Sequence, residues 1–223
     1  MAEPVKPRRS YHSPRRQQQA AATRQAILEA AQRLFERRGY PATTMEQVAA
    51  EAGVALKTVY LAFATKSGLL RALWDLRLKG DQAEAGVAER PWYREVLEEP
   101  DPERQLRRNA HNARVVKERI GGVLKMLRSA APVDPDAEAL WRLIQSDFHD
   151  NQRVIVESLH ARQALRPGLD VARATDILWT LNHPDVWQLL VAERGWTPAQ
   201  YEQWFGDPAC LQLLRTDGRA TRG

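Results

Sequence analysis

Apolar residues recur at helical spacing along almost the whole chain, and this periodicity most constrains the fold. In the first such segment they lie three, four, seven and eight residues apart, at Ile27, Ala30, Ala31, Leu34 and Phe35. No segment beyond Gly80 alternates as a strand does, and prolines and glycines divide the pattern into helix-sized lengths. The sequence therefore predicts an all-α fold.

Four short helices are expected between Thr23 and Leu76. Gly39 ends the first, and the Thr43-Thr44 pair offers a hydroxyl N-cap for the second, which Gly53 ends. The unit from Met45 to Phe63 then has the anatomy of a helix-turn-helix, with two short helices joined by a tight turn that contains glycine.

The second helix of this unit begins at Leu56 and directs Lys57, Thr58, Tyr60 and Leu61 away from the packed face. A cation, a hydroxyl, a phenol and an apolar group suit phosphate anchoring together with contacts to thymine methyl groups. Similar αα-hairpins also occur in purely structural bundles, so the pattern leaves both interpretations open.

Charge is distributed unevenly along the chain. The first 75 residues hold 12 Lys and Arg against 6 Asp and Glu, whereas the remaining 148 residues hold 21 against 22. All of the net positive charge therefore belongs to the first third, as expected if that third contacts a polyanion such as DNA. A basic surface without a partner is the alternative.

Composition also predicts the domain organisation. Residues 1–19 contain three prolines, five Lys or Arg and almost nothing apolar, which predicts a disordered basic arm. The arginines of this arm suit the minor groove or the phosphates of DNA, and disorder without contact is equally compatible with them. The expected divisions are the arm at 1–19, a helix-turn-helix domain at 20–68, a helical effector-binding and dimerisation domain at 69–215, and a disordered tail at 216–223.

Several classes of protein are disfavoured. Mean hydropathy is −0.53 and no uncharged apolar run approaches the ~18 residues of a membrane span, so no membrane association is expected. The N-terminus lacks the apolar region of a secretory signal, which makes the cytoplasm the expected location. A lone cysteine, Cys210, and five scattered histidines predict no disulfide, no metal and no cofactor.

An enzyme is also disfavoured. The run Asp147-Phe148-His149-Asp150 places a histidine between carboxylates, but neighbouring residues on a helix diverge by about 100° and do not converge. The sequence contains neither a glycine-rich phosphate loop nor a nucleophile elbow.

The stretch from Arg24 to Leu70 resembles the DNA-binding domain of TetR-type transcriptional regulators. The family pattern has a first helix ending in F-x-x-x-G-[YF], then T-T-[hydrophobic]-x-x-[IV]-A-x-x-A-G-V-S, then x-x-T-[hydrophobic]-Y-x-x-F-x-x-K. The matching residues are Phe35, Gly39, Tyr40, Thr43, Thr44, Met45, Val48, Ala49, Ala52, Gly53, Val54, Thr58, Val59, Tyr60, Phe63 and Lys66.

The resemblance implies roles for particular residues. Thr44 corresponds to the family threonine that caps the second helix and touches a phosphate, and Tyr60 and Lys66 match phosphate contacts. Lys57 and Thr58 lie where relatives contact base edges and backbone.

Two residues depart from the pattern. Ala55 replaces a capping serine, and Ala62 replaces a histidine or tyrosine that reaches DNA. They support an alternative function, a helical ligand-binding or adaptor protein that keeps the helix-turn-helix without sequence-specific DNA binding.

For the larger domain, the resemblance implies a homodimer on a palindromic operator, repression, and release by an effector of unknown identity. Residues 170–214 carry more large apolar groups than one core stripe needs, which suits dimerisation, although they also suit a monomer core. The helix from Ser67 to about Lys79 would link the two domains.

Candidate pocket residues for the effector combine aromatic walls with a few polar groups. Each is also compatible with an ordinary core or surface position. The candidates are His111, Arg114, Trp141, Phe148 and Trp179.

Overall fold

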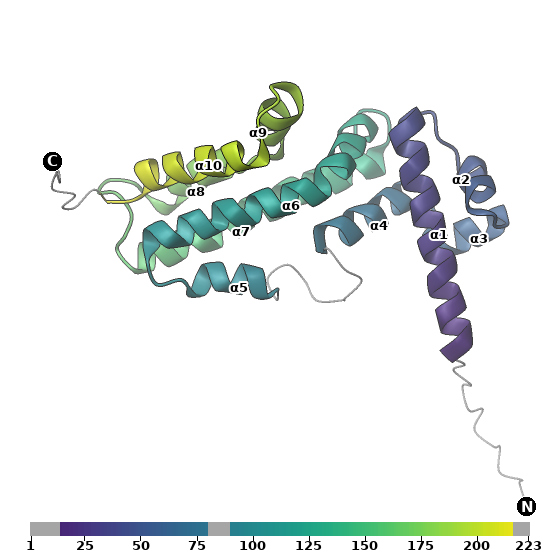
Figure 1. Ribbon diagram of the computed structural model, residues 1–223, viewed down its shortest axis with the longest axis horizontal. Helices are drawn as coiled ribbons and strands as arrows, with labels where there is room; N and C mark the ends of the chain where they lie inside the picture. Colours follow the sequence, from purple (N-terminus) through teal and green to yellow (C-terminus); the bar gives the residue numbers. More distant parts are fainter. Residues whose placement is uncertain (1–13, 80–89, 216–223) are drawn as a thin grey trace, which may run out of the picture. The chain divides into compact units, whose positions relative to one another are not determined.

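The computed structural model describes residues 14–79 and 90–215, and within these ranges it contains helices and no β-strand (Figure 1). The expected all-α fold is confirmed. By its internal contacts the chain divides into two compact units between Leu69 and Leu70. None of the helices in the described ranges is both long and apolar enough to cross a membrane. The predicted tail at 216–223 lies outside the described residues.

Within residues 14–69, the described part of the N-terminal unit contains three helices and the first turn of a fourth. α1 packs against α2, and α2 packs against α3. Their bounds are α1 Pro14–Arg38, α2 Met45–Ala52, α3 Leu56–Phe63 and α4 Lys66–Lys79. Fully buried Ile27, Val48 and Val59 show that each of the first three helices turns one apolar face inward.

α1 begins earlier than the sequence predicts. Residues 14–19 are helical, whereas we expected them to belong to the disordered arm; residues 1–13 lie outside the described residues. Proline is tolerated at the first position of a helix, and adding turns to a formed helix costs far less than nucleating one. The Arg, Gln and Ala residues after Pro14 have good helix propensity, so the helix extends back from its buried part.

The larger unit is built from the rest of α4 and the helices that follow. Their bounds are α5 Pro91–Glu98, α6 Pro102–Ala130, α7 Pro135–Ala161, α8 Val171–Leu181, α9 Pro184–Trp187, the π-helical segment η2 Gln188–Glu193 and α10 Pro198–Leu213. α10 packs along α6, and α8 packs along α7, as Figure 1 shows.

Capping residues fix the starts of the long helices. Asp101, Asp134 and Thr197 each accept a hydrogen bond from a backbone N–H of the first turn, and each precedes a proline. Asp170 caps α8 in the same way without a proline. Asp and Thr are among the residues preferred at the N-cap, so these starts follow from the residue types.

The helices after Asp170 are interrupted at Pro184, one of the prolines that divide the sequence pattern. α8 ends at Leu181 and α9 begins at Pro184. A proline in a helix interior removes one hydrogen bond and clashes with the preceding turn. His183 lies in this break and caps α9, because its Nδ1 accepts a hydrogen bond from the Asp185 N–H.

The core of the larger unit uses many of the apolar residues expected at a dimer interface. Leu178, Tyr201, Phe205 and Leu213 are fully buried within the chain itself. The large apolar residues of this region that stay exposed are fewer; Leu189 and Leu211 are 52% and 65% exposed. The monomer core therefore accounts for much of the apolar excess in residues 170–214.

A lysine lies in this core. Lys117 is 1% exposed, and its ammonium group donates to Oδ1 of Asn182 and lies 5.4 Å from the centroid of the Tyr201 ring. Burial lowers the pKa of Lys117 to about 7, because the charged form loses its hydration. Between pH 7 and the ordinary lysine pKa, unfolding therefore takes up a proton at this site, and the stability contributed here rises with pH.

We expect Lys117→Met to stabilise the larger unit at pH 7 by about 1–3 kcal/mol, the cost of burying the amine less the contribution of its hydrogen bond to Asn182. The gain should shrink as pH rises and nearly vanish above about pH 10, because there the lysine of the unfolded chain also loses its proton and burial no longer costs a charge. Urea unfolding followed by tryptophan fluorescence measures this, because all seven tryptophans lie beyond Leu69. An equal difference in stability at both pH values would contradict the pKa assigned to Lys117.

Candidate nucleic-acid interface

The start of α2 and the turn after it are fixed by local hydrogen bonds. The Thr44 hydroxyl accepts from the Gln47 N–H at 3.3 Å, and the Gln47 side chain accepts from the Thr44 N–H at 3.2 Å, which completes a capping box. Gly53 ends α2 with φ at 67°, a conformation that favours glycine. These two ends hold α2 and α3 in a helix-turn-helix.

α3 has one buried and one exposed face. Val59 and Phe63 point into the unit, whereas Lys57, Tyr60 and Leu61 are exposed. Leu61 is 78% exposed and Tyr60 45%. The structure therefore places three of the four outward residues expected from the sequence on the open face of α3, and leaves Leu56 and Thr58 half-buried beside it.

Arg24 attaches α3 to α1. Its guanidinium donates to the Ala62 carbonyl at 2.7 Å and lies 4.1 Å from the centroid of the Phe63 ring. α3 has only eight residues, and Ala55 provides no side-chain cap at its start. The contact with Arg24 stabilises the other end of this helix. The arginine was not identified from the sequence.

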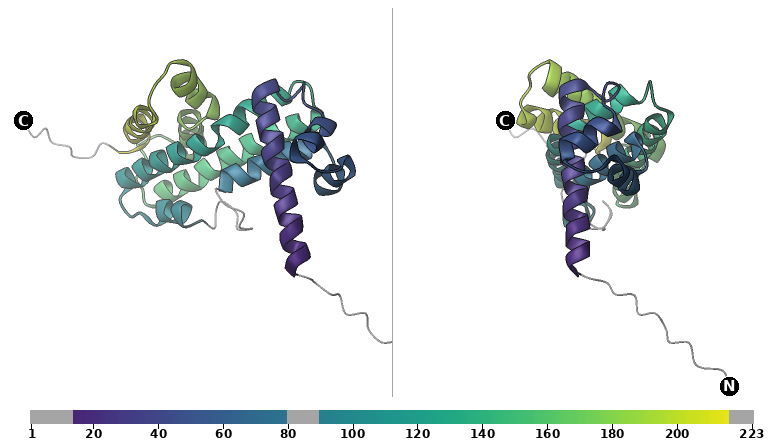
Figure 2. Two further views of the ribbon diagram at one scale, coloured as in Figure 1. Left: turned by 45° about the vertical axis from the view of Figure 1, so that its right-hand side comes forward. Right: turned by 90° about the vertical axis from the view of Figure 1, so that its right-hand side faces the viewer.

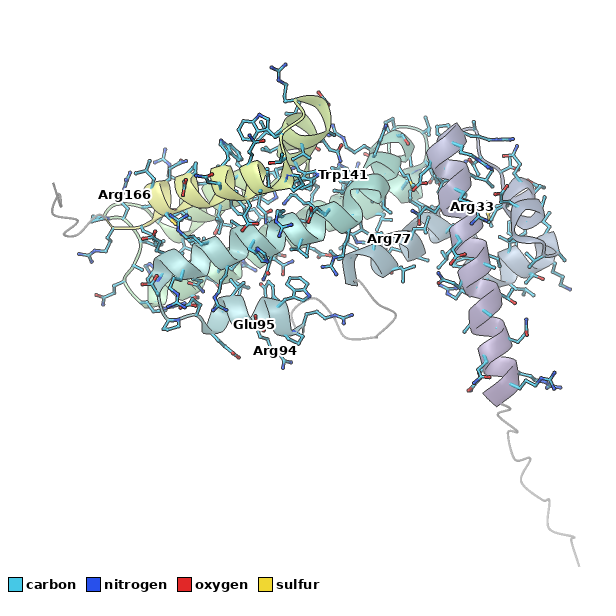
Figure 3. All side chains as sticks on the ribbon, viewed as in Figure 1. Arg33, Arg77, Arg94, Glu95, Trp141 and Arg166 are labelled. Atoms are coloured by element: carbon cyan, nitrogen blue, oxygen red, sulfur yellow. The ribbon has the colours of Figure 1, made fainter. Side chains whose placement is uncertain are left out.

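Two other arginines of α1 attach α2. Arg33, labelled in Figure 3, and Arg37 each lie 3.1 Å from a carboxylate oxygen of Glu51. These two hydrogen-bonded arginines lower the pKa of Glu51. All three side chains are solvent-accessible, so the pairs fix orientation more than they add stability.

Lys66 fastens the start of α4 to the loop between α1 and α2. Its ammonium donates to the carbonyls of Tyr40 and Thr43, both at 3.0 Å, and lies 4.3 Å from the Tyr40 ring centroid. Lys66 therefore holds the loop that presents Thr44. The phosphate contact expected for Lys66 stays a prediction.

The first turns of α1 form an exposed basic extension. Residues 15–22 are all exposed and include Arg15 and Arg16. Both views in Figure 2 show these turns continuing beyond α2 and α3. The extension places arginines on a rigid helix where a flexible arm was expected.

The five candidate effector residues are not brought together. His111 and Arg114, both on α6, pair with Glu202 of α10, at 3.2 Å and 2.5 Å, and so join two helices. Trp141 is half-buried on α7 (Figure 3). Trp179 packs against the rings of His149 and His183, and its Nε1 is buried without a hydrogen-bond partner in the described part of the chain. Phe148 lines a cavity between α4 and α7.

Comparison with known proteins agrees with this geometry. Residues 27–73 match the family of bacterial regulatory proteins described as tetR. A segment of 59 residues is 41% identical to the HTH-type transcriptional regulator AcrR of Shigella flexneri, and it covers 26% of this chain and 27% of AcrR.

Solved structures extend the likeness to the whole fold. NalD of Pseudomonas aeruginosa, described as the secondary repressor of the MexAB-OprM multidrug efflux pump, superposes with a TM-score of 0.67 at 22% identity, over 90% of this chain and all of NalD. SmeT in complex with triclosan gives 0.66 at 18% identity, over 88% and 93%. Residues 27–73 are therefore similar to the tetR family of bacterial regulatory proteins. At these identities the structural likeness establishes the fold of the chain, and the match to AcrR spans about a quarter of that relative.

The turn between α3 and α4 leaves no room for a side chain at Gly68. A Cβ there would lie 2.1 Å from the carbonyl oxygen of Phe63. We expect Gly68→Ala to destabilise the N-terminal unit by about 2 kcal/mol or more, because the obstacle is backbone. Circular dichroism melting compared with tryptophan fluorescence would assign the loss to that unit.

Gly122→Ala is the matched control. A Cβ at Gly122 meets nothing within 4 Å, and the residue lies inside α6. This change should stabilise the larger unit by about 0.5–1 kcal/mol through helix propensity. Equal stability of Gly68→Ala and the parent would contradict the packing described for the turn.

Proposed function

We propose that this chain is a ligand-responsive DNA-binding transcriptional regulator, a repressor that binds a palindromic operator as a homodimer through residues 44–63. The observation that carries the proposal is the exposed face of α3, where Lys57, Tyr60 and Leu61 stand clear of the buried Val59 and Phe63. A helix that presents a cation, a phenol and an apolar side chain suits the major groove of B-DNA. A protein with this function would act in the cytoplasm.

The distribution of charge also supports DNA binding by this surface. The excess of basic residues belongs to the first third of the chain, and Thr44 stands at the start of α2, where backbone N–H groups favour a phosphate. Phosphate contacts of this kind position a protein on the duplex, and the α3 side chains then select the sequence.

The proposal includes homodimerisation through residues 170–214, and the small size of the DNA-reading unit supports a dimer. One helix-turn-helix contacts a few base pairs, and two copies about one helical turn apart give useful affinity. Exposed Leu189 and Leu211 in this region would be covered by a second copy.

The effector is a small molecule in this proposal. Among the similar structures, SmeT was solved with triclosan, and a regulator from Saccharomonospora viridis, at 18% identity and a TM-score of 0.63 over 87% of this chain and 98% of its own, was solved with choline. These two ligands differ in charge and shape, so the neighbours support an effector without fixing its chemistry.

A second function competes with repression. Ala55 leaves α3 without a side-chain N-cap, and Ala62 offers no group that reaches DNA. Both residues favour a helical ligand-binding or adaptor protein that retains the helix-turn-helix without sequence-specific binding.

Selection of bound sequences from random duplexes separates the two functions. A repressor should enrich an inverted repeat whose half-sites lie about one helical turn apart. Failure to enrich any sequence would favour the adaptor, and an enriched sequence without two-fold symmetry would contradict the dimer.

The double variant Lys57→Ala, Tyr60→Ala should lose at least about tenfold in affinity for the selected site, because two groups of the exposed face are removed. Lys125→Ala, an exposed lysine of α6, is the control and should bind as the parent does.

The basic extension of α1 gives a further test. If Arg15 and Arg16 contact phosphates, changing both to Gln should reduce the salt dependence of operator binding by about 0.9 in the slope of log K against log salt for each phosphate that is no longer neutralised. Fluorescence anisotropy over a range of salt concentrations measures the slope. Lys125→Gln with Arg142→Gln removes the same charge from the larger unit and should leave the slope unchanged. An unchanged slope in the Arg15, Arg16 variant would exclude these contacts.

A further inference from the structure

The break between α8 and α9 is capped by a histidine. The imidazole Nδ1 of His183 accepts the backbone N–H of Asp185 at 3.1 Å. A backbone N–H can only donate, so the cap needs an acceptor. A neutral imidazole has one acceptor nitrogen, whereas an imidazolium donates from both nitrogens and has none. The cap therefore exists only while His183 is neutral.

The segment that follows this cap is weakly packed. α9 and η2 together cover residues 184–193, here called the α9–η2 segment, and no residue of η2 is buried. Leu189 is 52% exposed. The segment is anchored by Trp187, which packs against Tyr201 at 4.9 Å between ring centroids, and by Gln188, which donates to the Gly121 carbonyl at 3.4 Å. Segments with few buried side chains open locally at low free energy, so the cap matters for this one.

The charges nearest to His183 come from α6 and α9. Burial is the main cause that lowers the pKa of His183; Asp185 opposes it, and the positive charges of Lys117 and Arg128 lower the pKa further. Asp185 is shared, because Arg128 also pairs with it. The surroundings therefore favour the neutral imidazole that the cap requires.

The other elements around His183 contribute aromatic rings and paired groups. The Trp179 ring of α8 lies edge-on to the imidazole, with the centroids 4.8 Å apart. Beyond that ring, His149 of α7 pairs with Asp176 of α8 at 3.2 Å. From α10, the Tyr201 hydroxyl donates to a backbone carbonyl of α8 at 3.1 Å. The carboxylate on this side is therefore paired with His149.

We propose that the α8–α9 break is a pH-sensitive hinge, in which protonation of His183 removes the cap of α9 and releases the α9–η2 segment from α6. The imidazolium could still pair with the Asp185 carboxylate, 3.8 Å from Nδ1. That pairing leaves the Asp185 N–H without its acceptor and competes with Arg128 for the same carboxylate.

The direction of the pH dependence follows from the lowered pKa of His183. In the open break the imidazole regains water, and its pKa returns to the ordinary value of about 6.5. The capped form has the lower pKa, so the open form takes up the proton first as pH falls. The stability of the capped break is therefore complete above about pH 6.5 and is lost as pH falls below that value.

Lys117 is the alternative sensor, because burial lowers its pKa to about 7. Its bond to Asn182 does not depend on the charge, since a neutral amine also has N–H groups to donate. In the proposed hinge the charge of Lys117 acts on His183 by repulsion. We therefore expect Lys117→Met to raise the pKa of His183, measured by NMR of the imidazole protons, and to make the opening at low pH smaller without abolishing it.

Hydrogen exchange of the full chain, measured by mass spectrometry and corrected for the intrinsic pH dependence of exchange, tests the hinge without DNA. Between about pH 7.5 and about pH 5.5, amides of the α9–η2 segment should lose protection by about fivefold or more. His183→Asn should keep its protection at both values, because the asparagine oxygen accepts whatever the pH. His183→Ala should be poorly protected at both. His160→Asn, which removes an exposed histidine of α7, is the control and should behave as the parent does.

Three results would overturn the proposal. They are an equal loss of protection in His183→Asn and the parent, full protection of the segment in His183→Ala at the higher pH, and a loss that Lys117→Met abolishes, which would make Lys117 the sensor.

A consequence for DNA binding rests on the proposed function. The α9–η2 segment belongs to residues 170–214, through which homodimerisation is proposed, so its release should weaken the dimer and the operator complex at low pH. The exchange measurements involve no DNA. The hinge therefore stands if operator selection fails, and equal operator affinity at both pH values in a chain whose hinge opens would reject only this consequence.

Discussion

The N-terminal unit depends on the fact that α2 and α3, at eight residues each, are too short to be stable alone. Their stability comes from partners on both sides. The long α1 buries their apolar faces and attaches α3 through Arg24, while Lys66 at the start of α4 holds the loop that leads into α2. Each of these cations takes backbone carbonyls as acceptors and lies over an aromatic ring. Rigid placement of α3 is what allows its exposed side chains to meet a partner in a fixed register.

The larger unit is organised differently, because its helices are long enough to bury extended apolar stripes. Its core also contains buried polar groups, and burying them costs free energy. Lys117 is buried against Asn182, the residue that follows the end of α8, and Pro184 enforces the interruption. The amide side chain that accepts from Lys117 therefore comes from the break between α8 and α9.

Much of the fold could be predicted because it follows from local chemistry. Thr44, Asp170 and Thr197 cap helices, and Gly53 ends one, because the required oxygen or backbone conformation belongs to the residue itself. The start of α1 was missed because disorder was inferred from composition, whereas a helix already nucleated by buried residues extends at little cost. Lys117 gave a usable signal, since it shares the stripe of Ala113, Ile120 and Leu124, but a lone charge on such a stripe also suits the surface.

The candidate sites also contain features that were predictable from local sequence and features that were not. The sequence by itself determined which residues α3 presents, because one helix fixes which of its side chains share a face. It did not determine what lies opposite a given face. His111 and Arg114 bind Glu202, and Asp147 stands beside Trp74, only because helices distant in sequence pack together. Spacing along a chain defines faces, whereas the pairing of faces depends on the shapes of all the helices at once. Only the tertiary structure therefore decided which apolar residues close the core and which polar groups meet in a cavity.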